Sequence, residues 1–140
     1  MLSEGVAEGP ILALNLNTTL SAAGTEYWPN FEGKILLLED MEAPLSSTER
    51  SLQHLKFLNV FDQVQGLIIG KPEFYQQQGA PFGYSDLISE VVGPRSYPIM
   101  TEFDCGHTVP MISIPQLTPV RLQAEGTNKV NFVFLDGGVE

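Results

Sequence analysis

The sequence has few features that would point to disulfide bonds or membranes. Cys105 is the only cysteine among 140 residues, so no internal disulfide can form and an oxidising compartment is not required. The longest apolar runs, residues 35–38 and 66–70, are far shorter than the ~20 residues that span a bilayer. The amino terminus is acidic and lacks the apolar segment of a signal peptide. We therefore expect a cytoplasmic protein without a membrane partner.

Basic residues are scarce as well. The chain has 7 Lys and Arg against 17 Asp and Glu, which gives a formal net charge of −10. Such a surface repels the phosphate backbone, so we expect no nucleic-acid partner. The acidic balance is typical of a soluble protein and specifies no substrate.

Several catalytic and cofactor motifs are also missing. No serine lies in a G-x-S-x-G nucleophile elbow, and no Gly-rich loop of the Walker or dinucleotide kind is present. The two histidines and scattered acids do not supply the ligand set of a metal site. His54 belongs to the polar side of a predicted helix. We expect no metal and no organic cofactor.

The length and the 43% hydrophobic content are typical of a single domain with one core. Residues 1–9 are polar and contain glycine, and we expect them to be a linker or a cut end. Short, continuous apolar runs predict buried strands at 34–40, 66–70 and 97–102. Helical periodicity predicts helices at 18–24, 46–59 and 84–93. Alternating segments near the end predict antiparallel strands at 111–115, 120–126 and 129–137.

The order of these elements predicts an α/β fold. A strand–helix–strand unit almost always joins parallel strands by a right-handed crossover. We therefore expect a partly parallel sheet followed by an antiparallel, β-rich carboxyl-terminal portion. Ser46 with Glu49 predicts a capping box for the second helix, Asn59 a left-handed residue after it, and Ser85 the cap of the third.

Polar residues follow each predicted parallel strand. Glu39 and Asp40 come after the first, Glu73 after the second, and the segment 103–110, with the letters FDCGHTVP, after the third. Ligand sites of open α/β sheets lie at the carboxyl ends of the strands. Because adjacent strands are about 4.8 Å apart, we expect these groups to converge on one edge.

Glu39 and His107 are the strongest catalytic candidates. A carboxylate beside an imidazole fixes its tautomer and stabilises the imidazolium formed when the ring takes a proton from a nucleophile. The alternative is structural, with Glu39 capping a turn and His107 binding loop carbonyls. Cys105 is a weaker candidate for a nucleophile, because neighbours on an extended loop point apart and no helix begins there to lower its pKa.

Three stretches resemble one family of enzymes. They are NLNTTLSAAGTEYWPNFEGKILLLEDME (15–42), GLIIGKPE (66–73) and YPIMTEFDCGHTVPMISIP (97–115), with a Glu49–Arg50 pair opening a helix between the first two. Their order and spacing are similar to the carboxyl-terminal domain of the L,D-carboxypeptidase family of serine peptidases. That family includes muramoyl-tetrapeptide carboxypeptidases and the MccF-like microcin C immunity peptidases. The resemblance covers roughly residues 9 to 136.

The resemblance implies a swivelling β/β/α domain of a two-domain enzyme with a Ser–Glu–His triad. Glu39 and His107 match the family's glutamate and histidine, while the serine lies in an amino-terminal domain that this chain does not contain. The chain alone would then be inactive. Its partners would be that nucleophile domain, a small-molecule or peptide substrate and, by resemblance, a second copy in a homodimer.

The resemblance also suggests a substrate class. A Lys-Pro-Glu segment is similar to the microcin C immunity branch, in which the glutamate matching Glu73 contacts the substrate's amino group. Asn15 matches a further substrate contact, although Ala13 and Leu14 stand where the family usually has two glycines. The implied reaction is amide cleavage in an aminoacyl-adenylate-type or peptide substrate. The alternatives are a muropeptide L,D-carboxypeptidase and a non-catalytic binding domain.

Overall fold

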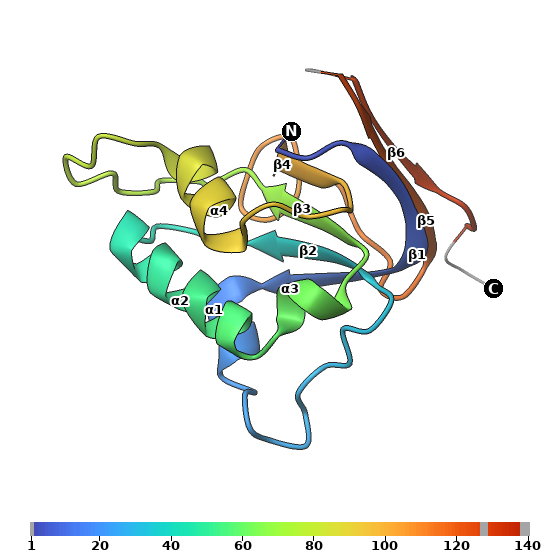
Figure 1. The fold of residues 1–140 in the computed structure, drawn as a ribbon, viewed down its shortest axis with the longest axis horizontal. Helices are drawn as coiled ribbons and strands as arrows, with labels where there is room; N and C mark the ends of the chain where they lie inside the picture. The colour runs from blue at the N-terminus through green and yellow to red at the C-terminus, as the bar shows by residue number, and fades with distance from the viewer. Residues whose placement is uncertain (1, 127–128, 138–140) are drawn as a thin grey trace.

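A computed structural model describes residues 2–126 and 129–137 as a six-stranded sheet with helices on one face (Figure 1). The strands are β1 (Gly5–Asn15), β2 (Ile35–Glu39), β3 (Gly66–Gly70), β4 (Ile99–Phe103), β5 (Pro119–Glu125) and β6 (Lys129–Phe134). The helices are α1 (Leu16–Leu20), α2 (Leu45–Phe57), α3 (Val60–Gln63) and α4 (Tyr84–Val92). The strand order is β4-β3-β2-β1-β5-β6. The predicted mixed α/β class, with a parallel part and an antiparallel tail, is confirmed.

The parallel part explains the continuous apolar runs. β1, β2, β3 and β4 run parallel, and residues 35–38 and 66–70 are buried. Successive side chains of a strand point to opposite faces. Leu36 and Leu38 pack in the cluster beneath the helices, whereas Ile35 and Leu37 pack with residues of β5 on the other face. Because both faces of these strands are covered, a polar side chain at an alternate position would be buried instead of solvated, and the runs are therefore apolar throughout.

β1 joins the two parts of the sheet. Ile11–Asn15 pair in parallel with β2, and Gly5–Pro10 pair antiparallel with β5. Figure 1 shows β1 curving away from the helices toward the hairpin of β5 and β6. The expectation that residues 1–9 are a linker or a cut end is therefore corrected for residues 5–9, which belong to β1. The two glycines and two glutamates of this segment are not typical of a strand. The backbone of residues 5–10 nevertheless pairs with β5, and a Ser3–Ile99 bridge precedes this pairing.

Two predicted helix caps are also wrong. α2 begins one residue earlier than expected, with Pro44 as its cap, so Ser46 lies inside the first turn. The carbonyl of Pro44 accepts hydrogen bonds from the backbone N–H groups of Ser47 and Thr48. The cap of α4 is Gly83, whose N–H donates to the carboxylate of Asp86 at 2.9 Å. Asn59 adopts the left-handed conformation, φ 57°, as predicted.

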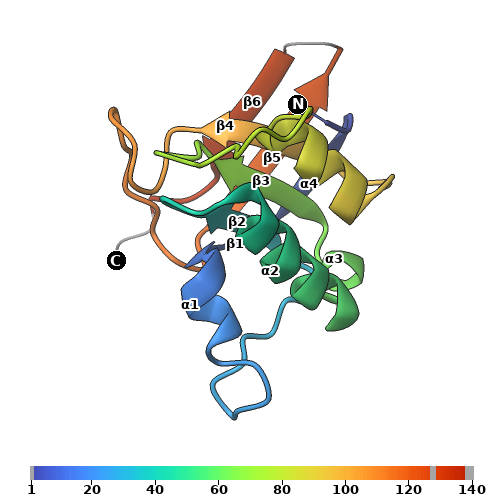
Figure 2. The same cartoon turned by 90° about the vertical axis from the view of Figure 1, so that its left-hand side faces the viewer.

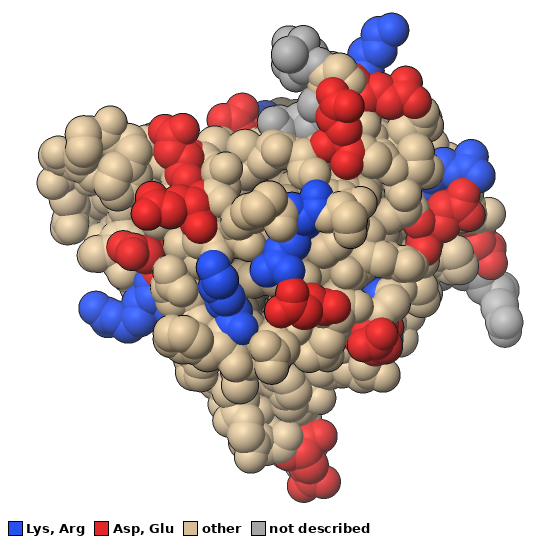
Figure 3. All heavy atoms as spheres, viewed as in Figure 1, with Lys and Arg blue, Asp and Glu red and all other residues tan. Residues whose placement is uncertain are grey.

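The segment 111–115 is not a strand, although its letters alternate. It lies at the surface without regular secondary structure, and Ile112 donates its N–H to the carbonyl of Asp104 at 3.0 Å. The first helix lies at Leu16–Leu20 instead of 18–24, because the side chain of Asn15 caps it. On the face shown in Figure 3, basic and acidic side chains are interspersed. Among the described residues, no helix is long and apolar enough to cross a membrane.

Candidate active site

The candidate site lies where the parallel strands end. The arrows of β2 and β3 point left in Figure 1, so their carboxyl ends face the viewer in Figure 2. Asn15 and Glu39 are register partners at the last position of the β1–β2 ladder. The segment that follows β4 brings His107 to the same edge, 68 residues after Glu39 in the sequence.

Glu39 and His107 form a hydrogen-bonded pair. Nδ1 of His107 lies 2.9 Å from Oε2 of Glu39. The Glu39 side chain is 12% exposed and the His107 side chain is 51% exposed, so the acid is the more buried member of the pair. A carboxylate only accepts hydrogen bonds, so in the neutral imidazole Nδ1 carries the proton and Nε2 has the lone pair. This arrangement suits an imidazole that takes a proton from an outside group.

The other oxygen of Glu39 also has a partner. Nδ2 of Asn15 donates to Oε1 of Glu39 at 2.6 Å. Oδ1 of the same Asn15 accepts a hydrogen bond from the N–H of Thr18 at 2.9 Å. The sequence predicted Asn15 as a substrate contact, which stays a prediction, and did not predict its contact with Glu39. The register of β1 and β2 was the missing information.

Two glycines let the β4 loop lie against Glu39. Gly106 has φ +110°, and a Cβ built on it would lie 2.8 Å from Oε2 of Glu39. A Cβ on Gly70 would lie 2.6 Å from the carbonyl oxygen of Cys105. Both distances are shorter than any carbon–oxygen contact allows. The sequence reasoning missed these two positions, although a glycine directly before the candidate histidine was a usable signal.

An ion pair ties the ends of β3 and β4 together. The ammonium group of Lys71 pairs with the carboxylate of Asp104. The N–H of Lys71 also donates to the carbonyl of Phe103 at 2.9 Å. Each side chain is 40% exposed, so the charge pair adds little stability. The contacts fix where the loop that carries His107 leaves the sheet.

Cys105 occupies an environment that disfavours the thiolate. Burial raises the pKa of the Cys105 thiol, and the negative charge of Glu39 raises it further. Because the thiolate is the reactive form, this cysteine is a poor nucleophile at neutral pH. The structure thus favours the inert thiol over the alternative that the sequence left open.

Glu73 lies beside the segment that follows Glu39. Its carbonyl accepts a hydrogen bond from the N–H of Glu42 at 3.0 Å, and it bridges in parallel to Met41. The residue is half-buried, and within the described part of the chain its carboxylate makes no hydrogen bond or ion pair. The carboxylate is therefore free for a ligand, and the role of Glu73 as a substrate contact stays a prediction.

Asp40 anchors the helices behind the site. It is 4% exposed and accepts hydrogen bonds from Thr48 at 2.9 Å, Asn17 at 3.1 Å and the N–H of Met41 at 3.1 Å. Burial raises the pKa of Asp40, while the hydrogen bond from Thr48 opposes that rise. Asn17 in turn accepts a hydrogen bond from Ser51 of α2 at 3.1 Å. This network joins α1, α2 and the end of β2.

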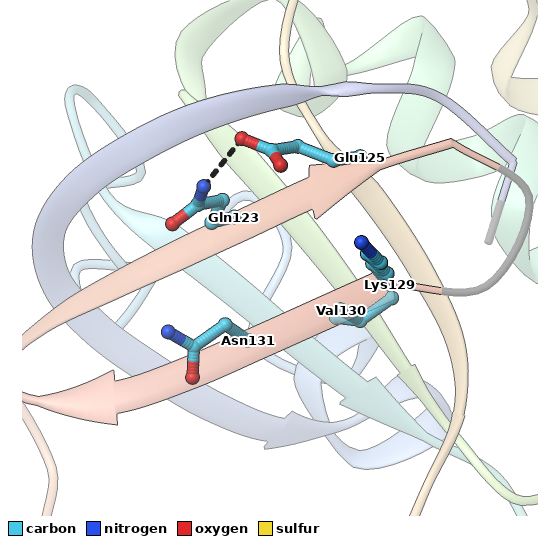
Figure 4. Close-up of a pocket in the computed structure, with 5 residues that line it drawn as sticks. All are labelled: Gln123, Glu125, Lys129, Val130 and Asn131. Atoms are coloured by element: carbon cyan, nitrogen blue, oxygen red, sulfur yellow. Dashed lines mark hydrogen bonds between the residues drawn. The ribbon is translucent and has the colours of Figure 1, made fainter.

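A surface hollow lies away from these residues, on the β5–β6 hairpin. It has a volume of about 440 Å³ and is lined by side chains of the β5–β6 hairpin, namely Gln123, Glu125, Lys129, Val130 and Asn131 (Figure 4). It contains none of the candidate site residues. In residues 2–126 and 129–137, no cluster of three or more His, Cys, Asp and Glu side chains has the arrangement of a metal site.

Comparison with known proteins gives consistent matches. Residues 8–122 match the family described as LD-carboxypeptidase C-terminal domain. The chain is 34% identical over 126 residues to the microcin C7 self-immunity protein MccF of Escherichia coli, which covers 89% of this chain and 36% of that protein. It is 36% identical over 115 residues to a putative carboxypeptidase of Vibrio cholerae, covering 81% of this chain and 34% of that protein.

Solved structures show the same fold. The structure of MccF in complex with glutamyl sulfamoyl guanosine superposes with a TM-score of 0.80 at 31% identity, over 87% of this chain and 37% of that one. The muramoyltetrapeptide carboxypeptidase of Oxalobacter formigenes gives a TM-score of 0.82 at 22% identity, over 93% and 46%. The chain thus spans about a third of the length of the curated relatives it matches.

Proposed function

The chain belongs to the LD-carboxypeptidase C-terminal domain family, a family of serine carboxypeptidases, and on that basis we propose that it supplies the acid and the base of a Ser–Glu–His triad. His107 is the general base and Glu39 is its orienting carboxylate. The serine comes from an amino-terminal domain of the same protein. The Glu39–His107 hydrogen bond, with Nε2 left free, is the observation that carries this proposal.

The free nitrogen of His107 supports a nucleophile that comes from outside. Among the described residues, no side chain forms a hydrogen bond with Nε2. The relatives contain roughly twice as much further sequence as the part matched here. Val109 and Met111, which follow His107, are 93% and 62% exposed. Apolar side chains so open to water favour packing against another part of the protein.

The proposed reaction is acyl transfer. The serine hydroxyl attacks the amide carbonyl while Nε2 of His107 accepts its proton, and Glu39 stabilises the imidazolium. His107 then gives that proton to the departing amine, which leaves an acyl-serine. In the second half, His107 accepts a proton from water, and the resulting attack releases the carboxylic acid and returns the proton to the serine.

We propose an aminoacyl-adenylate-type substrate. Solved structures of MccF contain that protein in complex with glutamyl sulfamoyl guanosine and with aspartyl sulfamoyl adenosine. The unpaired carboxylate of Glu73 suits the ammonium group of an aminoacyl compound, because charge-assisted hydrogen bonds are about twice as strong as neutral ones. A muropeptide is the competing substrate, favoured by the putative carboxypeptidases among the relatives.

The missing nucleophile gives a direct test. We expect the 140-residue chain alone to hydrolyse neither an aminoacyl-sulfamoyl adenosine nor a muropeptide. A fusion to the amino-terminal region of MccF should cleave the first, measured by chromatography of released amino acid. Turnover by the isolated chain would contradict the proposal that the serine comes from another domain. A fusion that cleaves the muropeptide but not the aminoacyl-sulfamoyl adenosine would contradict the proposed substrate. A fusion that carries His107→Gln serves as the control for contaminating activity.

Glu73→Gln should weaken recognition of the substrate's amino group. Loss of one charge-assisted hydrogen bond, worth about 1.5–3 kcal/mol, lowers kcat/KM by about 10- to 100-fold, mainly through KM. The measurement is steady-state kinetics of the fused enzyme with an aminoacyl substrate and with its N-acetylated analogue. Glu90→Gln, an exposed acid on α4, is the matched control. Equal kcat and KM for Glu73→Gln and the parent would contradict the prediction that Glu73 contacts the substrate's amino group.

A further inference from the structure

We infer that Asn15 is the positioning residue that holds the Glu39 carboxylate in line with His107. The inference rests on the proposed function for its catalytic meaning, but its geometry stands on its own. Asn15 donates to Oε1 of Glu39 at 2.6 Å, while Oε2 of Glu39 pairs with the ring at 2.9 Å. The three side chains form one hydrogen-bonded series that runs from the end of β1 to the β4 loop.

The orientation of the Asn15 amide follows from its other partner. The N–H of Thr18 is purely a donor, so the atom that it contacts at 2.9 Å must be the oxygen Oδ1. The NH2 group is therefore the end that faces Glu39. The carbonyl of Asn15 also accepts from the hydroxyl of Thr19 at 2.7 Å, which fixes the backbone at the same point. The first turn of α1 thus sets the direction of the donor.

The side chain at position 15 must therefore accept at one end and donate at the other. Aspartate preserves the cap on α1, but it places a second carboxylate against Glu39, and two like charges so close cannot both ionise. Alanine removes both contacts. Glu39 is only 12% exposed, so water replaces the lost donor poorly. Asparagine alone meets both demands with its short side chain.

Without this donor, one oxygen of Glu39 has no fixed partner. The carboxylate is then free to rotate, and the half-exposed His107 ring loses a defined direction. Errors of about 1 Å in the placement of catalytic groups reduce rates about 100-fold. The contact from Asn15 therefore affects the chemical step through Glu39, without Asn15 touching the reacting atoms.

The test uses the 140-residue chain labelled with 15N in histidine. In the parent, the ring nitrogen shifts of His107 should report the tautomer with the proton on Nδ1. In Asn15→Ala and in Asn15→Asp, which both remove the donor to Oε1 of Glu39, the ring protons of His107 should redistribute toward Nε2. His54, exposed on α2, is the internal control in each spectrum.

Kinetics of the fused enzyme give a second, independent measurement. Asn15→Ala should lower kcat about 10- to 100-fold at nearly constant KM. A raised KM with unchanged kcat, or an unchanged tautomer of His107, would overturn the inference. Loss of the fold in both variants would also overturn it, because it would assign Asn15 to the stability of α1. If the tautomer of His107 changes in Asn15→Ala, but the parent fused enzyme hydrolyses neither substrate, the inference holds and the proposed function is refuted.

Discussion

Replacing His107 with glutamine in the fused enzyme should lower kcat by about 10⁴-fold or more, because no other group can take the serine proton. Substrate binding should change little, since glutamine keeps a polar side chain of similar size at the same place. Single-turnover kinetics with an aminoacyl-sulfamoyl adenosine, together with calorimetric titration of the same ligand, separate these two effects.

His54→Gln is the matched control for this experiment. It removes the other histidine of the chain, which is exposed on α2, and it should leave kcat unchanged. A loss of activity that is equal in the two variants would point to a general effect on the protein. Near-normal turnover by His107→Gln would show that the Glu39–His107 pair has a structural role only.

Gly106→Ala should separate His107 from Glu39. The added methyl group would lie 2.8 Å from Oε2 and 2.9 Å from Cβ of Glu39, so one side chain or the loop must move. The residue also has φ +110°, which alanine adopts only with strain of about 1–3 kcal/mol. We expect a lower unfolding temperature, loss of the Nδ1–H tautomer of His107, and a decrease in kcat of about 100-fold or more.

Gly24→Ala distinguishes the steric clash from the backbone strain. Gly24 has φ +79°, and nothing lies within 4 Å of a Cβ built on it. This control should lower the unfolding temperature modestly and leave the His107 signals in place. Unchanged His107 shifts in Gly106→Ala would mean that the loop relaxes without disturbing the pair, which would contradict the steric argument.

The parallel core and its polar ends could be predicted from the sequence. Runs such as 35–38 and 66–70 permit only doubly buried strands, and a helix between two of them fixes their relative direction. The meeting of Glu39 and His107 follows from that arrangement, because Glu39 ends β2 and His107 lies in the loop after β4, at the same edge of the sheet. Strand order predicts that these residues meet, whereas their catalytic roles rest on the family resemblance.

The features that were missed depend on contacts between distant segments. Residues 5–9 resemble a linker in sequence, and only their backbone pairing with β5 makes them a strand. Residues 111–115 alternate like a strand but pair with no neighbouring strand in the described part of the chain. The amide of Asn15 needs both the cap of α1 and the β1–β2 register before its partner is evident. The glycine at 106 is explained by Glu39, which lies far away in the sequence.

The course of β1 has a mechanical consequence. Its first half pairs with the hairpin, and its last residue, Asn15, donates a hydrogen bond to Glu39, which pairs with His107. A single continuous strand therefore connects the hairpin to the Glu39–His107 pair. The two ends of the sheet should accordingly melt together, as one cooperative unit.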